Sequence, residues 1–156
     1  MTNFNDHIIS IIGTGNLGSA VGQHLLSNNK NTLIKGFDLD NKQSKKAKDS
    51  NSISHASKSY AECIHDTSLI ILAVPTSATY EILENIKDII NSETTILDFS
   101  SSKRAVSEWS NNFLPNNEVI GIYPFVKDDT LLNINWGVIS YLSTKNKSTA
   151  FANKLI

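Results

Sequence analysis

The sequence has little cysteine, proline and methionine: one Cys, three Pro and one Met among 156 residues. The single Cys63 excludes a disulfide within the chain and a cysteine metal cluster, and it fits a reducing compartment. No apolar run approaches the roughly 18 residues that a membrane-spanning helix needs, and the N-terminus MTNFNDH lacks a signal-peptide pattern. We therefore expect a cytoplasmic protein without a membrane partner.

Neither sign of charge is in excess, since the sequence has 14 basic and 15 acidic residues and a net charge of −1. Domains that bind nucleic acid usually carry a basic excess, so this balance predicts no nucleic-acid partner. The length is that of one ordinary domain. We expect a single domain over residues 1–156.

Six short apolar runs with little polar alternation are typical of strands buried on both faces of a parallel sheet. They are Ile8–Ile12, Thr32–Phe37, Leu69–Val74, Thr94–Phe99, Val119–Ile122 and Gly137–Leu142. The segment NSISH around Ile53 adds a weak third strand in chain order. Apolar residues at helical spacing separate several of the runs, such as Ile82, Ile86 and Ile89. This alternation predicts a doubly wound, mainly parallel α/β sheet with strand order 3-2-1-4-5-6 and a seventh strand.

A glycine motif follows the first run, in the stretch IISIIGTGNLGSAVG. Gly13, Gly15 and Gly18 form GxGxxG between an expected strand and an expected helix, the context of a Rossmann dinucleotide site. Gly13 would turn the chain, Gly15 would let a pyrophosphate approach the backbone, and Gly18 would let the helix lie close to the sheet. The alternative is a glycine-rich packing turn.

Asp38 ends the second run, 20 residues after the last glycine of the motif. A carboxylate there accepts hydrogen bonds from the adenosine ribose and repels a 2′-phosphate, which favours NAD over NADP. Lys42, Lys45 and Lys46 follow closely and either reach a 2′-phosphate or form the solvated face of a helix.

Three further segments resemble the nucleotide-binding domain of prephenate and arogenate dehydrogenases, within the wider 6-phosphogluconate dehydrogenase-like superfamily. They are TSLIILAVPTSATYEIL, TTILDFSSSKRAV and VIGIYPF. The resemblance implies that Val74, Pro75 and Thr76 pass beside the cofactor. It also implies that Ser101 contacts substrate and nicotinamide, and that Lys103 stands in the place of the family's lysine.

The departures from that family concern the chemistry. Tyr123 aligns with the family's catalytic histidine, and Ser100 with the glycine before its active-site serine. Tyr123 is a candidate for proton transfer, against the alternative that its ring fills space. The family's helical second domain is not among these residues, so we expect a homodimer to close the substrate pocket.

Several polar residues near the fifth strand have two interpretations. Lys103 and Arg104 either attract a substrate carboxylate or are solvated cations in a first helical turn. One of Ser100, Ser101 and Ser102 is expected to cap the following helix, and Asp98 is an inward polar anchor rather than a base.

Thr76 and Ser77, after the fourth strand, are interpreted as cofactor contacts, helix caps or both. The four histidines lack metal-ligand spacing, so we predict no metal site.

We predict a small NAD-dependent oxidoreductase that transfers hydride between nicotinamide and a small carboxylated alcohol or amine, with NADP a less favoured cofactor. Tyr123 and Ser101 are the candidate catalytic residues. The candidate cofactor-binding residues are Gly13, Gly15, Asn16, Leu17, Gly18, Asp38, Val74, Pro75 and Thr76. The alternatives are a non-catalytic NAD-binding regulatory or scaffold module and an imine or pyrroline-type reductase.

Overall fold

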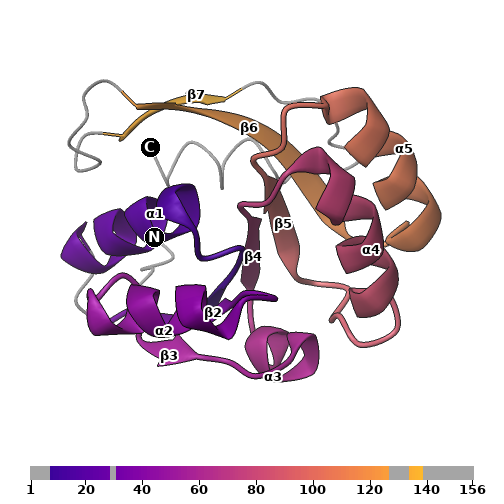
Figure 1. The fold of residues 1–156 in the computed structure, drawn as a ribbon. Coiled ribbons are helices and arrows are strands. Elements are labelled where there is room, and N and C mark those ends of the chain that lie inside the picture. Colours follow the sequence, from indigo (N-terminus) through magenta and orange to yellow (C-terminus); the bar gives the residue numbers. More distant parts are fainter. Residues whose placement is uncertain (1–7, 29–30, 127–133, 139–156) are drawn as a thin grey trace.

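The computed structural model describes residues 8–28, 31–126 and 134–138, and the side chains of these residues up to Tyr123. Strands and helices alternate along the chain from β1 to β6, and β7 is the last described element (Figure 1). The elements are β1 (Ile8–Ile12), α1 (Asn16–Asn28), β2 (Leu33–Phe37), α2 (Asn41–Asp49), β3 (His55–Ala56), α3 (Tyr60–Ile64), β4 (Leu69–Leu72), α4 (Thr76–Ile86), β5 (Thr95–Asp98), α5 (Lys103–Phe113), β6 (Glu118–Val126) and β7 (Ile134–Val138).

The strands form one sheet in the order β3-β2-β1-β4-β5-β6-β7. All neighbours are parallel except β6 and β7, which are antiparallel. The predicted order and the seventh strand are confirmed. The order reverses between β1 and β4, the point in such sheets where a crevice opens at the carboxyl ends of the strands.

Among the six apolar runs, two strand boundaries differ from the sequence prediction by three residues or more, and the others by at most two. The sixth strand was expected to end at Ile122 but continues to Val126, so Tyr123 lies within it and pairs with Gly137. The last strand begins at Ile134, three residues before the expected start. The remainder of that prediction, 139–142, lies outside the described residues. The antiparallel partner β7 explains the longer β6, because it supplies hydrogen bonds beyond the end of β5.

Apolar side chains cover both faces of the sheet, which accounts for its near-continuous apolar strands. On one face, Ile9 and Ile11 of β1 pack with α1 and α2. On the other face, Ile12 packs with α3, α4 and α5. Side chains alternate along a strand, so the intervening Ser10 faces α3, where its hydroxyl donates to the Cys63 carbonyl at 2.6 Å. Cys63 is fully buried on α3, as expected for a packed thiol.

Candidate functional site

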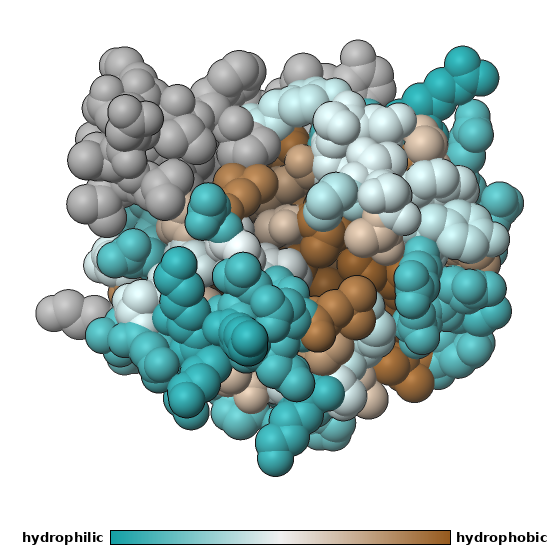
Figure 2. All heavy atoms as spheres, in the orientation of Figure 1, coloured by the Kyte–Doolittle hydropathy of each residue, from teal (hydrophilic) through white to brown (hydrophobic). Residues whose placement is uncertain are grey.

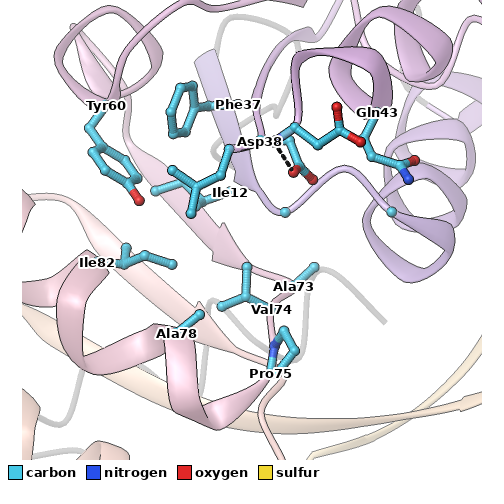
Figure 3. A pocket seen from close by; sticks show the side chains of 14 residues that line it. Ile12, Phe37, Asp38, Gln43, Tyr60, Ala73, Val74, Pro75, Ala78 and Ile82 are labelled. Atoms are coloured by element: carbon cyan, nitrogen blue, oxygen red, sulfur yellow. Dashed lines mark hydrogen bonds between the residues drawn. The ribbon is translucent and has the colours of Figure 1, made fainter.

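A pocket of about 400 Å³ opens at the carboxyl ends of β1, β2 and β4. Figure 2 shows apolar side chains in a hollow on this side of the molecule, with hydrophilic side chains over α2 beside it. Figure 3 shows the lining side chains at close range. The lining residues are Ile12, Gly13, Gly15, Phe37, Asp38, Leu39, Asp40, Gln43, Tyr60, Ala73, Val74, Pro75, Ala78 and Ile82.

Gly13 is required by the fold. Its φ of +91° is one that L side chains rarely adopt. A Cβ there would lie 2.5 Å from the Ala73 carbonyl oxygen and 2.6 Å from Val74 Cγ1. Its N–H donates to the Phe37 carbonyl at 2.9 Å, which ties the turn after β1 to the end of β2. Gly13 therefore shapes the pocket wall.

Gly15 differs from Gly13 because a Cβ there would meet nothing within 4 Å, and the residue faces the pocket. Helix α1 begins at the next residue, Asn16, and carries no acidic side chain in its first turn. Free N–H groups at a helix start and the positive end of the helix dipole favour an anion. The space over Gly15 therefore suits a pyrophosphate.

Asp38 links the glycine turn to the start of α2. Its Oδ2 accepts from the Thr14 N–H at 2.8 Å, and its Oδ1 accepts from the Asp40 N–H at 3.0 Å. A carboxylate has about four acceptor positions, so capacity remains for the hydroxyls of a ribose. Asp38 is half-buried on the pocket wall rather than a freely solvated surface acid.

The opposite part of the pocket is apolar. The rings of Phe37 and Tyr60 lie 4.6 Å apart, centroid to centroid, at an interplanar angle of 59°. Burial raises the pKa of the Tyr60 phenol, and the negative charges of Glu81 and Asp38 add to this. With Ile82 from α4, these side chains make a wall suited to a flat ring.

The sequence-predicted cofactor residues divide into two groups. Gly13, Gly15, Asp38, Val74 and Pro75 line the pocket.

Four other predicted residues are not in its lining. Asn16, Leu17 and Gly18 form the first turn of α1, and Thr76 is the first residue of α4. Because Pro75 occupies the N-cap position of α4, Thr76 does not cap that helix, and the cap interpretation of Thr76 and Ser77 is wrong.

A second polar cluster lies beyond the pocket, where β5 and β6 pass the start of α4. The Thr76 and Ser101 hydroxyl oxygens are 3.4 Å apart, and the Ser102 N–H donates to Thr76 Oγ1 at 3.3 Å. The Tyr123 hydroxyl donates to the Ser101 carbonyl at 3.2 Å. The structure thus brings the two candidate catalytic residues together. Ser101 is exposed and Tyr123 half-buried.

Lys103 lies beneath this cluster and is buried, so neither sequence interpretation of it holds: it is not solvated, and its ammonium is engaged within the protein. Its Nζ donates to the Asp98 carbonyl at 2.6 Å, to Asp98 Oδ2 at 3.1 Å and to the Ile122 carbonyl at 3.0 Å. An ammonium has three N–H donors, and three acceptors surround this one. Burial lowers the Lys103 pKa, while the charge of Asp98 and its hydrogen bond oppose that shift.

Lys103 also contacts the candidate tyrosine, since its Nζ lies 4.7 Å from the centroid of the Tyr123 ring. Gly121 leaves room for the lysine stem, because a Cβ there would be 2.7 Å from Lys103 Cδ.

The neighbouring polar residues complete this arrangement. Asp98 is the predicted inward anchor, and its Oδ2 also accepts from the Ser100 hydroxyl at 2.8 Å. Ser102 occupies the N-cap position of α5, but its side chain makes no capping bond. Arg104, unlike Lys103, is exposed and pairs with Glu108 one turn later at 3.1 Å.

The described histidines pair locally. His55 lies 2.8 Å from Glu62, and His65 lies 2.9 Å from Asp66. Over residues 8–28, 31–126 and 134–138, no cluster of three or more potential ligands is arranged to hold a metal ion. Nor does any helix of these ranges have the length and apolar character to span a membrane.

Comparisons with known proteins agree with this geometry. Residues 21–128 match the family described as prephenate dehydrogenase, nucleotide-binding domain. A glycerol-3-phosphate dehydrogenase [NAD(P)+] of Halothermothrix orenii is 30% identical over 125 residues, which are 74% of this chain and 35% of that protein.

Among solved structures, prephenate dehydrogenase from Aquifex aeolicus in complex with hydroxyphenyl propionate and NAD+ aligns with a TM-score of 0.81 at 20% identity. The alignment covers 96% of this chain and 56% of that one. Synechocystis arogenate dehydrogenase aligns with a TM-score of 0.80 at 16% identity, over 96% and 55% of the two chains. The chain thus spans about a third to just over half the length of these relatives. It belongs to the family of prephenate dehydrogenase nucleotide-binding domains.

Proposed function

We propose that this chain binds NAD(H) in the pocket between β1, β2 and β4, and that it supplies the cofactor side of an oxidoreductase. One observation carries the proposal: the backbone at Gly15 is open toward the pocket, and the Asp38 carboxylate lines the same pocket. Family membership supports it, since the family is named for nucleotide binding.

The residues present fit such a cofactor. The open backbone at Gly15 and the start of α1 would hold the pyrophosphate. Asp38 would accept from the ribose hydroxyls, and the wall of Phe37, Tyr60 and Ile82 would receive the adenine ring. When bound, the nicotinamide supplies the hydride donor or acceptor, and the protein contributes position and electrostatics.

The reacting end would lie at the second cluster. We propose that the Ser101 hydroxyl orients a small carboxylated alcohol or amine. The Tyr123 hydroxyl would exchange a proton with the alcohol or amine group of that substrate. The Tyr123 hydroxyl now donates to the Ser101 carbonyl at 3.2 Å, so it must turn from that bond toward a substrate. A tyrosine can act as acid or base when its surroundings match its proton affinity to the reaction.

The exposure of Ser101 supports a further part of the proposal, a homodimer in which each copy covers the other's site. Hydride transfer benefits from the exclusion of water. Analytical ultracentrifugation with and without NADH tests this. A dimer whose dissociation constant falls when NADH is added supports the proposal. A monomer that turns over substrate at full rate contradicts it.

The decisive experiment is a fluorescence titration with NADH on the wild type and on Gly15→Ala. Because the added methyl group meets no protein atom within 4 Å, Gly15→Ala should unfold like the wild type. It should nevertheless bind NADH at least about tenfold more weakly, since the methyl group would stand where the pyrophosphate approaches. Ser27→Ala, at the exposed end of α1, is the control and should bind normally.

The outcomes separate the candidate functions. Binding of neither NADH nor NADPH by the wild type overturns the proposal. NADH binding without an absorbance change at the nicotinamide band, across a panel of 2-hydroxy acids, amino acids and cyclic imines, replaces the oxidoreductase with a non-catalytic NAD-binding module. Oxidation of NADH by cyclic imines alone identifies an imine reductase.

A further inference from the structure

A second carboxylate lies at the same wall of the pocket as Asp38. Asp40 lines the pocket two residues further along the chain. It is the N-cap of α2, where its Oδ1 accepts from the Lys42 N–H at 3.0 Å. Its own N–H donates to Asp38 Oδ1 at 3.0 Å. The two acids are therefore held in one hydrogen-bonded arrangement.

Cations do not balance these charges within the lining. The pocket is bordered by Asp38 and Asp40 but, over the described part of the chain, by no lysine or arginine. The cations that follow the two acids in sequence are Lys42, Lys45 and Lys46 on α2, and their side chains are exposed. The lining thus carries two negative charges beside the place where Asp38 would meet the ribose.

We propose that Asp40 is a second specificity-determining residue that, together with Asp38, selects against nucleotides phosphorylated on the ribose 2′-hydroxyl. This inference rests on the proposed NAD(H) site. The start of a helix ordinarily favours a phosphate through its free N–H groups and its dipole. At α2 the Asp40 carboxylate already takes the Lys42 N–H and places a negative charge there.

The consequence is a two-part exclusion of NADP(H). A 2′-phosphate would be repelled by the Asp38 carboxylate. At the start of α2 it would also be repelled by the Asp40 carboxylate, which already accepts the Lys42 N–H that could otherwise bind the phosphate. Removal of Asp40's charge alone should therefore strengthen NADPH binding and leave NADH binding nearly unchanged, because an unphosphorylated ribose brings no charge to this position.

The test compares NADH and NADPH affinities, followed by reduced-nicotinamide fluorescence, for wild type, Asp40→Asn and Asp40→Ser. Both Asn and Ser are good N-caps, so the start of α2 is preserved. We expect the NADPH dissociation constant to fall about five- to tenfold in either variant, and the NADH constant to change less than twofold. Asp49→Asn, at the exposed far end of α2, removes the same charge away from the pocket and should change neither.

Two further measurements sharpen the result. The preference of the wild type for NADH should shrink as salt is raised from 0.02 to 0.5 M, roughly the range over which surface charges become screened, and should shrink less in Asp40→Asn. In the Asp38→Asn and Asp40→Asn double variant, NADPH should bind more tightly than in either single variant.

Failure of this inference is distinguishable from failure of the proposed function. Wild type that binds neither nucleotide overturns both. Wild type that binds NADH and NADPH equally, or Asp40 variants that shift both nucleotides alike or neither, overturn the role of Asp40 while the NAD(H) site stands.

Discussion

The ammonium of Lys103 and the carboxylate of Asp98 form a buried ion pair, with Nζ and Oδ2 3.1 Å apart and the two side chains 6% and 1% exposed. The same ammonium donates to the Ile122 carbonyl, so the pair joins the end of β5 to the middle of β6. Ser101 lies three residues after Asp98, and Tyr123 directly follows Ile122. The ion pair therefore fixes the separation of the two candidate catalytic residues.

Replacement of Lys103 by methionine should destabilise the protein by about 3–5 kcal/mol, because it leaves the Asp98 carboxylate buried without its counter-charge. Chemical denaturation measures this change. Arg104→Met is the matched control, since it removes the adjacent but exposed cation, and it should change the free energy of unfolding by less than about 1 kcal/mol. Equal effects of the two substitutions would show that the buried pair is not stabilising relative to a surface one.

Alanine substitutions at Gly13 and Gly15 should differ in their effect on folding stability, because only Gly13 is required by the backbone geometry. Gly13→Ala should cost more than about 2 kcal/mol of folding stability, since it combines a positive φ with a Cβ 2.5 Å from a carbonyl oxygen. Gly15→Ala should cost less than about 1 kcal/mol. Thermal melts of both variants without nucleotide check this. A Gly13→Ala protein as stable as the wild type would contradict the strained geometry.

Alkaline pH should destabilise the fold through Cys63. Burial raises the pKa of this thiol from 9.0 to about 11. Between these values the unfolded chain loses the thiol proton while the folded chain keeps it, so stability falls as pH rises. The loss amounts to about 2 kcal/mol by pH 11, where the folded thiol also begins to ionise.

Because Lys103 has a lowered pKa, its titration acts in the opposite direction, and the useful quantity is the difference between wild type and Cys63→Ala. Urea unfolding at pH 8 and at pH 11 should show a smaller loss in the variant. Equal losses of stability in the wild type and in Cys63→Ala would show that the alkaline destabilisation arises from groups other than the Cys63 thiol.

Tyr123→Phe should leave NADH affinity within about twofold of the wild type, because Tyr123 lies outside the pocket proposed for the ribose and adenine and the substitution keeps its ring. Loss of its bond to the Ser101 carbonyl should cost about 1 kcal/mol of stability. If Tyr123 transfers a proton, turnover of any substrate found in the screen should fall by about 100-fold or more. Unchanged turnover would assign the ring a packing role beside Lys103.

Local sequence patterns predicted the strand order of the fold and five of the residues that line the pocket. Continuous apolar runs predicted the buried strands because a sheet covered on both faces needs apolar residues at successive positions. The places of Gly13, Gly15 and Asp38 in the pocket lining were predictable because all three lie at characteristic spacing within one βαβ unit.

Residues whose surroundings come from distant segments were not predicted. Tyr60 reaches the pocket from α3, after a crossover that no local pattern specifies. Lys103 resembled a surface cation at a helix start, and its burial depends on Asp98, on Ile122 and on the absence of a side chain at Gly121. Tyr123 was placed near the end of a strand, but its position inside β6 depends on pairing with β7.

The two backbone hydrogen bonds accepted by Asp38, from Thr14 and from Asp40, have a consequence for how affinity is interpreted. Through them one carboxylate holds the glycine turn and the start of α2 in place before any ligand arrives. Much of the ordering cost is then met during folding, which favours fast association and a small entropic penalty on binding. Substitution of Asp38 would therefore slow association as well as remove a contact, and only rate measurements can separate the two effects.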